Sequence, residues 1–219
     1  TVATAPPLAG AAERRFSAHV AQHVLLGMVA PLLLALGTPV ALLVQSVSPR
    51  RRAPILSALR GAGAVLNPFT GWVVFVASLF VLYFSPLYRL SLDHEVIHHA
   101  VHVHFLVAGL VYFVPVLGVD PLPHPLSHGA RALSLALAVP VHGFLGVALM
   151  SSSQASLSGG AGAAALADQR LGGGLMWLLG DVVMLAALAV VVVQWMRADE
   201  RVAAREDRCA ARRPPFPST

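Results

Sequence analysis

Five long apolar stretches constrain this chain more than any other feature of its sequence. An α-helix rises about 1.5 Å per residue, so about 20 apolar residues can cross a hydrocarbon core of roughly 30 Å. A chain with 57% apolar and only 11% charged residues does not fit a water-soluble globule. We therefore predict an all-α fold, a polytopic transmembrane helix bundle with about five spans. The expected spans lie at about residues 17–44, 66–87, 96–117, 131–151 and 174–196.

The fifteen basic residues are all arginines, and their distribution predicts how the bundle is oriented. One side of the membrane would hold eleven of them: Arg50, Arg51, Arg52, Arg60, Arg131, Arg197, Arg201, Arg205, Arg208, Arg212 and Arg213. The other side would hold four: Arg14, Arg15, Arg89 and Arg170. The positive-inside rule then predicts a multi-pass protein of a bacterial plasma membrane, with its amino terminus outside and its carboxyl tail in the cytoplasm. Since the arginines sit in loops and a tail, we expect the lipid bilayer as a partner and no nucleic acid.

The chain divides into three parts without internal repeats. We expect residues 1–15 to form an outer amino-terminal segment, 16–197 the transmembrane helix bundle and 198–219 a cytoplasmic charged tail. The single cysteine lies in that tail and can form no intrachain disulfide. The first twelve residues lack a signal-peptide pattern, so we expect the chain to be processed or to be part of a longer protein.

Ten histidines are many for a membrane protein, because ionisable groups inside the bilayer are costly. His19 and His23 are four residues apart in the first span, and His94, His98 and His102 follow the same spacing in the third. Residues at this spacing share one helix face with β-carbons about 5–6 Å apart, so two imidazoles can reach one ion. The spacing predicts a metal site.

Depth in the membrane supports the same prediction. His23 and His102 each lie about seven residues from the outer end of their spans, which places them about 10 Å deep at about 1.5 Å per residue. His142 lies about eight residues from the outer end of the fourth span. Three helices therefore place imidazole at one level.

Imidazole suits copper, zinc, iron and nickel, and histidines without cysteine suit a site that holds and releases an ion. We expect copper, with haem as an alternative. The predicted primary ligands are His19, His23, His98 and His102, with His142 as a closing ligand. Further candidates are His94, His104, Asp168 near the mouth and Asp181 beside a ligand histidine. For Met150 and Met176 we expect core packing, although thioethers favour cuprous ions.

The histidines also allow interpretations that involve no copper. They could be interhelical hydrogen-bonding groups in a tightly packed bundle. The segment from His94 to His99 resembles a box of the membrane di-iron enzymes, but those boxes lie on the cytoplasmic face and this one is predicted outside. Two histidines from the first and third spans could instead hold a haem iron. A proton-relaying transporter fits less well, because the polar residues gather at one face.

Motifs in all five spans are similar to those of the CtaG-type cytochrome c oxidase assembly proteins, specifically the integral-membrane branch of Gram-positive bacteria. The resemblance covers about residues 16–200. It rests on residues 16–23 with Pro31 to Pro39, on residues 83–88, on His98, His102, His104 and Phe105, on residues 140–146, and on residues 167–169 with 172–174 and Trp177. Many members have a histidine in the second-span segment, and this chain has none.

The resemblance implies a non-enzymatic assembly factor for haem-copper cytochrome c oxidase. It further implies copper delivery or handling, no catalytic residues, and cytochrome c oxidase subunits as partners. Members of the family usually carry additional helices before the first span found here, so this chain would be a carboxyl-terminal part.

Overall fold

The computed structural model describes residues 10–12, 14–61, 63, 67–120, 126–152, 157 and 162–211, and its regular structure there is helical. The elements are α2 (Phe16–Val24), the π-helical turn η2 (Leu25–Val29), α3 (Ala30–Leu36), α4 (Pro39–Ser46), α5 (Pro49–Gly61), α6 (Pro68–Phe84), α7 (Leu87–Asp93), α8 (Glu95–Leu117), α9 (His128–Met150) and α10 (Ala163–Ala211). Among the described residues, four helices are long and apolar enough to cross a membrane, or five if the bent pair α6 and α7 forms one span. The predicted all-α membrane bundle is confirmed.

The first span is shorter than predicted. It runs without a break through α2, η2 and α3 from Phe16 to Leu36 and ends where Thr38 adopts a left-handed backbone, with φ of 53°. Helix α4 then leaves the bundle and buries none of its residues. The predicted continuation to residue 44 is wrong because the strained turn before Pro39 redirects the chain, although the residues of α4 are apolar.

A close helix crossing explains how the first span tolerates Pro31. Proline cannot donate a hydrogen bond to the carbonyl four residues earlier, which here belongs to Gly27. The π-helical turn lies directly before this site, and Gly109 of α8 packs against the Gly27 carbonyl oxygen and the Pro31 ring. The Gly27 carbonyl therefore lies against a neighbouring helix.

The second span bends sharply at its outer end. Helix α6 ends at Phe84 and α7 continues at 72° to it, after Ser85 and Pro86. Proline disfavours helical backbone in the residue before it, and Ser85 is indeed extended. The Ser85 hydroxyl accepts a hydrogen bond from the amide of Leu87 (3.2 Å), the first residue of α7.

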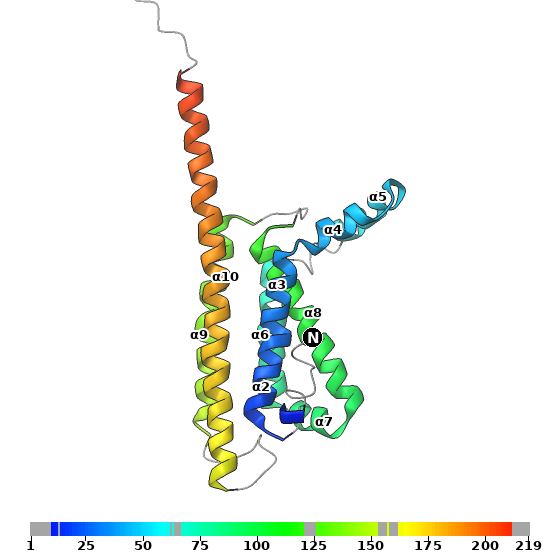
Figure 1. The fold of residues 1–219 in the computed structure, drawn as a ribbon, viewed down its shortest axis with the longest axis vertical. Coiled ribbons are helices and arrows are strands. Elements are labelled where there is room, and N and C mark those ends of the chain that lie inside the picture. Colours follow the sequence, from blue (N-terminus) through cyan, green and yellow to red (C-terminus); the bar gives the residue numbers. More distant parts are fainter. Residues whose placement is uncertain are drawn as a thin grey trace, which may run out of the picture.

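Helices α9 and α10 form a tight antiparallel pair. Gly146 and Gly173 face each other so closely that a β-carbon on either would lie 2.7 Å from the carbonyl oxygen of the other. Glycine at such positions allows close backbone approach, as is common between membrane helices. Helix α10 continues without interruption past residue 197 to Ala211 and projects beyond the bundle (Figure 1).

The two ends of the bundle carry different side chains. Figure 1 shows α5 and the carboxyl-terminal part of α10 at the upper end, and α7 with the start of α2 at the lower end. Exposed arginines occupy the upper end: Arg50, Arg51, Arg52, Arg197, Arg201, Arg205 and Arg208. The histidines of α2 and the first turns of α8 therefore lie at the end opposite this arginine cluster.

Candidate metal centre

Four histidine rings from two helices form one cluster. His19 and His23 lie one turn apart on α2 with ring centroids 4.3 Å apart, and His98 and His102 repeat this on α8 at 4.2 Å. Between the helices, the centroids of His19 and His98 are 5.5 Å apart, and those of His23 and His102 are 5.3 Å apart. We call these residues the four-histidine cluster. The structure brings together all four predicted primary ligands.

The helix crossing creates the room for these rings. The first span and α8 touch backbone to backbone at Gly27 and Gly109, and toward the lower end in Figure 1 they diverge. His23 lies four residues before Gly27, and His102 lies seven residues before Gly109. At this level the gap between the two helices holds both imidazole rings. The glycines thus let the two helices touch at the crossing, and the divergence beyond it makes room for the histidines.

Aromatic side chains wall the four-histidine cluster. Tyr88 of α7 packs edge-on against His19, with centroids 5.0 Å apart, and Phe105 stacks on His23 at 5.2 Å. Tyr83 lies behind His23 at 6.4 Å, and its buried hydroxyl forms no hydrogen bond with the described residues. The wall explains why His19 and His23 are only 0% and 2% exposed.

The buried rings lack hydrogen-bond partners within the described residues. Both ring nitrogens of His19, both of His23 and the Nε2 of His102 are buried without one. Each buried polar atom left in this state costs about 1–3 kcal/mol. Several unpaired ring nitrogens buried close together therefore call for an explanation, such as a bound ligand.

The rings are close enough for one ion but are not already arranged around one. Two imidazoles bound to one ion through bonds of about 2 Å have centroids roughly 4–6 Å apart. The four centroid distances lie in this range. Among the described residues, however, no group of three or more His, Cys, Asp or Glu side chains is placed to hold an ion without adjustment. Ring rotation would be required.

His142 is not brought into the four-histidine cluster. It is 0% exposed in the middle of α9, with its ring centroid 5.8 Å from that of Phe75. Its Nδ1 lies 2.9 Å from the Ala138 carbonyl oxygen, and its Nε2 is buried without a partner among the described residues. Helix α10 packs over this ring at Gly180. The expected depth of His142 matches that of the cluster, but depth does not determine which neighbouring helix a side chain faces.

The other candidates lie around the rim or elsewhere. His94 is exposed at the start of α8. His104 points toward α6, where its Nε2 lies 2.7 Å from the Ser78 hydroxyl. Asp181 has one carboxylate oxygen buried without a hydrogen-bond partner in the described part of the chain. In the structure, none of these three takes a place among the four clustered rings.

Asp168 holds the start of α2. Its carboxylate accepts hydrogen bonds from the Phe16 amide (2.7 Å) and the Ser17 hydroxyl (2.5 Å). These groups belong to the first turn of α2, whose amides have no partner inside the helix. Asp168 therefore caps, from α10, the helix that carries His19 and His23. The sequence alone suggests a different role for it, guiding a cation near the mouth.

We expect Asp168→Ala to lower the free energy of unfolding by about 1–2 kcal/mol, the usual cost of losing a helix cap. If the four-histidine cluster binds a metal, the metal content of the folded protein should remain at the wild-type level. Unfolding in detergent and metal analysis would measure the two effects separately. Asp199→Ala, an exposed position on the projecting part of α10, is the matched control. Unchanged stability of Asp168→Ala would contradict the capping role.

Sequence reasoning missed two residues that position the site. Tyr83 and Tyr88 belong to a family motif that assigns them no role, yet both rings face the histidines of α2. The available signal was the position of Pro86 between them, because a bend there folds the second tyrosine back over the bundle. A tyrosine buried in a membrane span also calls for a partner for its hydroxyl.

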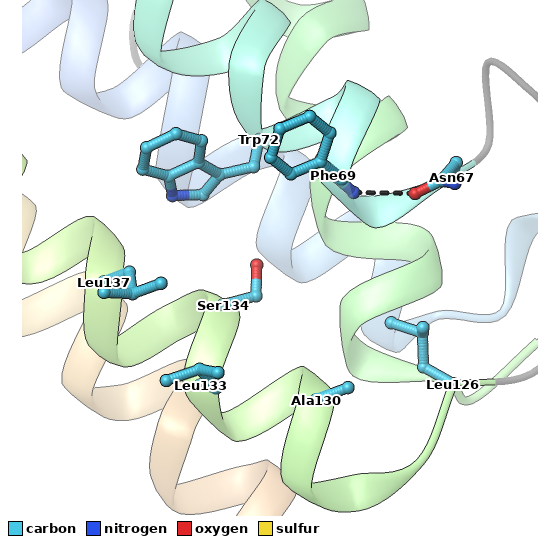
Figure 2. Close-up of a pocket in the computed structure, with 8 residues that line it drawn as sticks. All are labelled: Asn67, Phe69, Trp72, Leu126, Ala130, Leu133, Ser134 and Leu137. Carbon is cyan, nitrogen blue, oxygen red and sulfur yellow. Dashed lines mark hydrogen bonds between the residues drawn. The ribbon is translucent and has the colours of Figure 1, made fainter.

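A separate cavity lies near the arginine-rich end. It has a volume of about 270 Å³ between α6 and α9, and Figure 2 shows its lining residues, including Trp72 and Leu137. Its polar lining residues are Asn67, which accepts a hydrogen bond from the Phe69 amide (2.9 Å), Ser134, and Trp72, whose Nε1 is buried without a hydrogen-bond partner among the described residues. Within the described residues, no histidine, cysteine or carboxylate lines it, so it offers no metal ligands comparable to the four-histidine cluster.

Comparison with known proteins shows which family this chain resembles. The family described as "Cytochrome c oxidase caa3 assembly factor (Caa3_CtaG)" matches residues 1–198. Uncharacterized proteins of Mycobacterium bovis and Mycobacterium tuberculosis are 36% identical over 211 residues, and one of Mycobacterium leprae is 33% identical. Each match covers 89% of this chain but 32% of the relative, so the chain spans about a third of their length. No solved structure matches the chain.

Proposed function

The chain belongs to the Caa3_CtaG family of cytochrome c oxidase caa3 assembly factors, and from this premise we propose that it helps to assemble a haem-copper oxidase by holding copper in its four-histidine cluster. The observation that carries the proposal is the meeting of four imidazole rings at centroid distances of 4.2–5.5 Å. The proposal includes no catalytic step. Its partners would be oxidase subunits at the same membrane.

The chemistry of the donor set fits copper. A neutral imidazole offers one lone pair, and a bound ion would satisfy nitrogens that have no hydrogen bond within the described residues. Imidazole ligands suit cupric copper well, whereas the cluster lacks the thiolates typical of permanently held structural metals. Such a site can bind an ion and pass it on.

Exposure decreases from the rim of the cluster to its floor. His94 and His99 are exposed, His98 and His102 are partly buried, and His19 and His23 are buried. An ion arriving from water would meet α8 first and α2 last. With the arginine-rich end in the cytoplasm, as the positive-inside rule predicts, this opening faces the outer side of the membrane.

Copper loading of the purified chain tests the proposal. The full chain in detergent would be exposed to Cu(II), washed, and analysed for metal content and optical absorption. We expect one Cu(II) ion per chain with imidazole ligation, and its loss in the double variant His98→Ala/His102→Ala. The matched control is His104→Ala/His128→Ala, which removes two histidines that do not belong to the cluster.

The alternatives predict different results. Copper that survives in His98→Ala/His102→Ala would contradict the four-histidine site, as would wild-type protein that binds none. Haem absorption in the wild-type protein would instead favour a bis-histidine haem site. Equal copper binding by the wild type and the control, with equal thermal unfolding, supports the proposal.

A further inference from the structure

We propose that α4 and α5 form a membrane-surface arm that binds anionic phospholipid headgroups at the arginine-rich end of the bundle. This α4–α5 arm consists of an apolar helix followed by three consecutive arginines, Arg50, Arg51 and Arg52. Figure 1 shows both helices extending sideways from the end of α3. The arm contains no residue of the four-histidine cluster, so the proposal does not depend on that cluster binding copper.

The α4–α5 arm begins where the first span leaves the hydrocarbon core. That span is a helix of 21 residues, about 31 Å long at about 1.5 Å per residue, which matches a core of roughly 30 Å. Only Gly37 and Thr38 separate it from α4, and two extended residues reach at most about 7 Å. The start of α4 therefore lies at the membrane surface.

Contacts with the end of α8 fix the start of the arm. Thr38 turns the chain with its left-handed backbone, and Asp120, just after α8, accepts hydrogen bonds from the Val40 amide (3.3 Å) and the Ala41 amide (2.9 Å). The Asp120 side chain is buried, although the arm itself is not. The direction in which α4 leaves the bundle is thus set by the fold.

Helix α4 carries apolar side chains on an element that leaves the bundle. From Pro39 to Val44 every residue is apolar, and none of α4 is buried within the described part of the chain. Leu42 and Leu43 are 58% and 52% exposed. A short apolar helix at the membrane surface is stabilised when it lies in the interface, with its leucines among the acyl chains.

The charge of the α4–α5 arm identifies the lipid. Arg50, Arg51 and Arg52 are exposed, and residues 39–61 contain no aspartate or glutamate. The positive-inside rule places this end of the bundle at the cytoplasmic leaflet, whose surface potential is negative and attracts arginines. Charge complementarity therefore favours anionic over zwitterionic phospholipids.

A nitroxide label on α4 tests the arm in the full chain. Leu43→Cys in a Cys209→Ser background would carry the label, in vesicles of phosphatidylcholine with or without phosphatidylglycerol. Accessibility to oxygen and to a water-soluble nickel complex would show whether the label lies in lipid or in water. We expect immersion in lipid in the anionic vesicles and much less in the neutral ones. The difference should shrink at about 1 M salt, where the Debye length is about 3 Å.

Charge variants test the role of the arginines. In the anionic vesicles, Arg50→Gln/Arg51→Gln should lower the ratio of immersed to water-exposed label by about fivefold for each arginine, or roughly 25-fold in total. The matched variant Arg201→Gln/Arg205→Gln, which changes two exposed arginines of α10 at the same end, should leave the ratio unchanged. Equal effects of the two variants would contradict a specific role of the arm.

A second label position controls for exposure alone. Val202, on the projecting part of α10, has the same exposed fraction as Leu43, 52%, so a label on Val202→Cys should report water in both kinds of vesicle. A label on Leu43→Cys that stays in water would overturn the proposal, as would equal immersion in neutral and anionic vesicles. A label shielded from both reagents would show that α4 packs against protein, which also overturns it. All these positions are exposed, and circular dichroism would verify folding.

Discussion

Gly109→Ala is expected to lower the free energy of unfolding by about 3 kcal/mol, the upper part of the range for overpacked interiors. A β-carbon at this position would run into the Gly27 carbonyl oxygen and lie 2.5 Å from Cγ of Pro31. Backbone and a proline ring cannot rotate away, so α8 would have to move off the first span. Unfolding by sodium dodecyl sulfate, followed by circular dichroism, would measure the change.

Gly174→Ala provides the matched control for this substitution. Gly174 lies inside α10, and a β-carbon there would meet no atom within 4 Å in the described part of the chain. Alanine favours helix over glycine by about 1 kcal/mol, so this variant should be as stable as the wild type or slightly more stable. Equal stability of the two alanine variants would refute the close crossing of α8 with the first span.

Arg131→Met is expected to cost about 3 kcal/mol or more, because it leaves several buried acceptors without a donor at about 1–3 kcal/mol each. The Arg131 Nε donates to the Val116 carbonyl oxygen at 2.5 Å, and its guanidinium also donates to the Leu117 carbonyl and the Gln194 side chain. One side chain thus closes the carboxyl end of α8 and ties α9 to α10. Unfolding by sodium dodecyl sulfate would measure this loss of stability as well.

Two further variants sharpen the test of Arg131. Arg131→Lys keeps the positive charge but loses the planar fork that reaches several acceptors at once, so its stability should lie between those of the wild type and Arg131→Met. Arg201→Met replaces an exposed arginine of α10 and should change stability little. If Arg131→Met behaves like Arg201→Met, the capping of α8 contributes nothing to folding.

These two contacts bear on function because both act on α8, which carries two rings of the four-histidine cluster. Gly109 sets how near α8 comes to the first span, and Arg131 holds its other end. The rings themselves contribute unsatisfied buried nitrogens and so destabilise the bundle. The contacts of Gly109 and Arg131 therefore offset the cost of burying the four histidine rings, which packing alone would disfavour.

The sequence by itself determined that the chain folds in a lipid bilayer, that it is helical, and which histidines form the four-histidine cluster. Apolar length can be counted because every backbone polar group in a bilayer must be satisfied within a helix. The four-residue spacing of His19 with His23 and of His98 with His102 is a property of one helix, so it too can be found without a fold. Equal depth made their meeting across two helices a prediction, and the structure brings the rings together.

Only the tertiary structure decided which faces of the helices meet. Depth could not show that His142 turns toward α10, because rotation of a helix about its axis leaves the height of each residue unchanged. The roles of Asp168 and Arg131 were hidden for a related reason, since each caps a helix other than its own. The length of the first span depended on one left-handed residue, Thr38, which hydropathy does not detect. Interhelical packing and one backbone turn, neither visible in a local pattern, fixed these features.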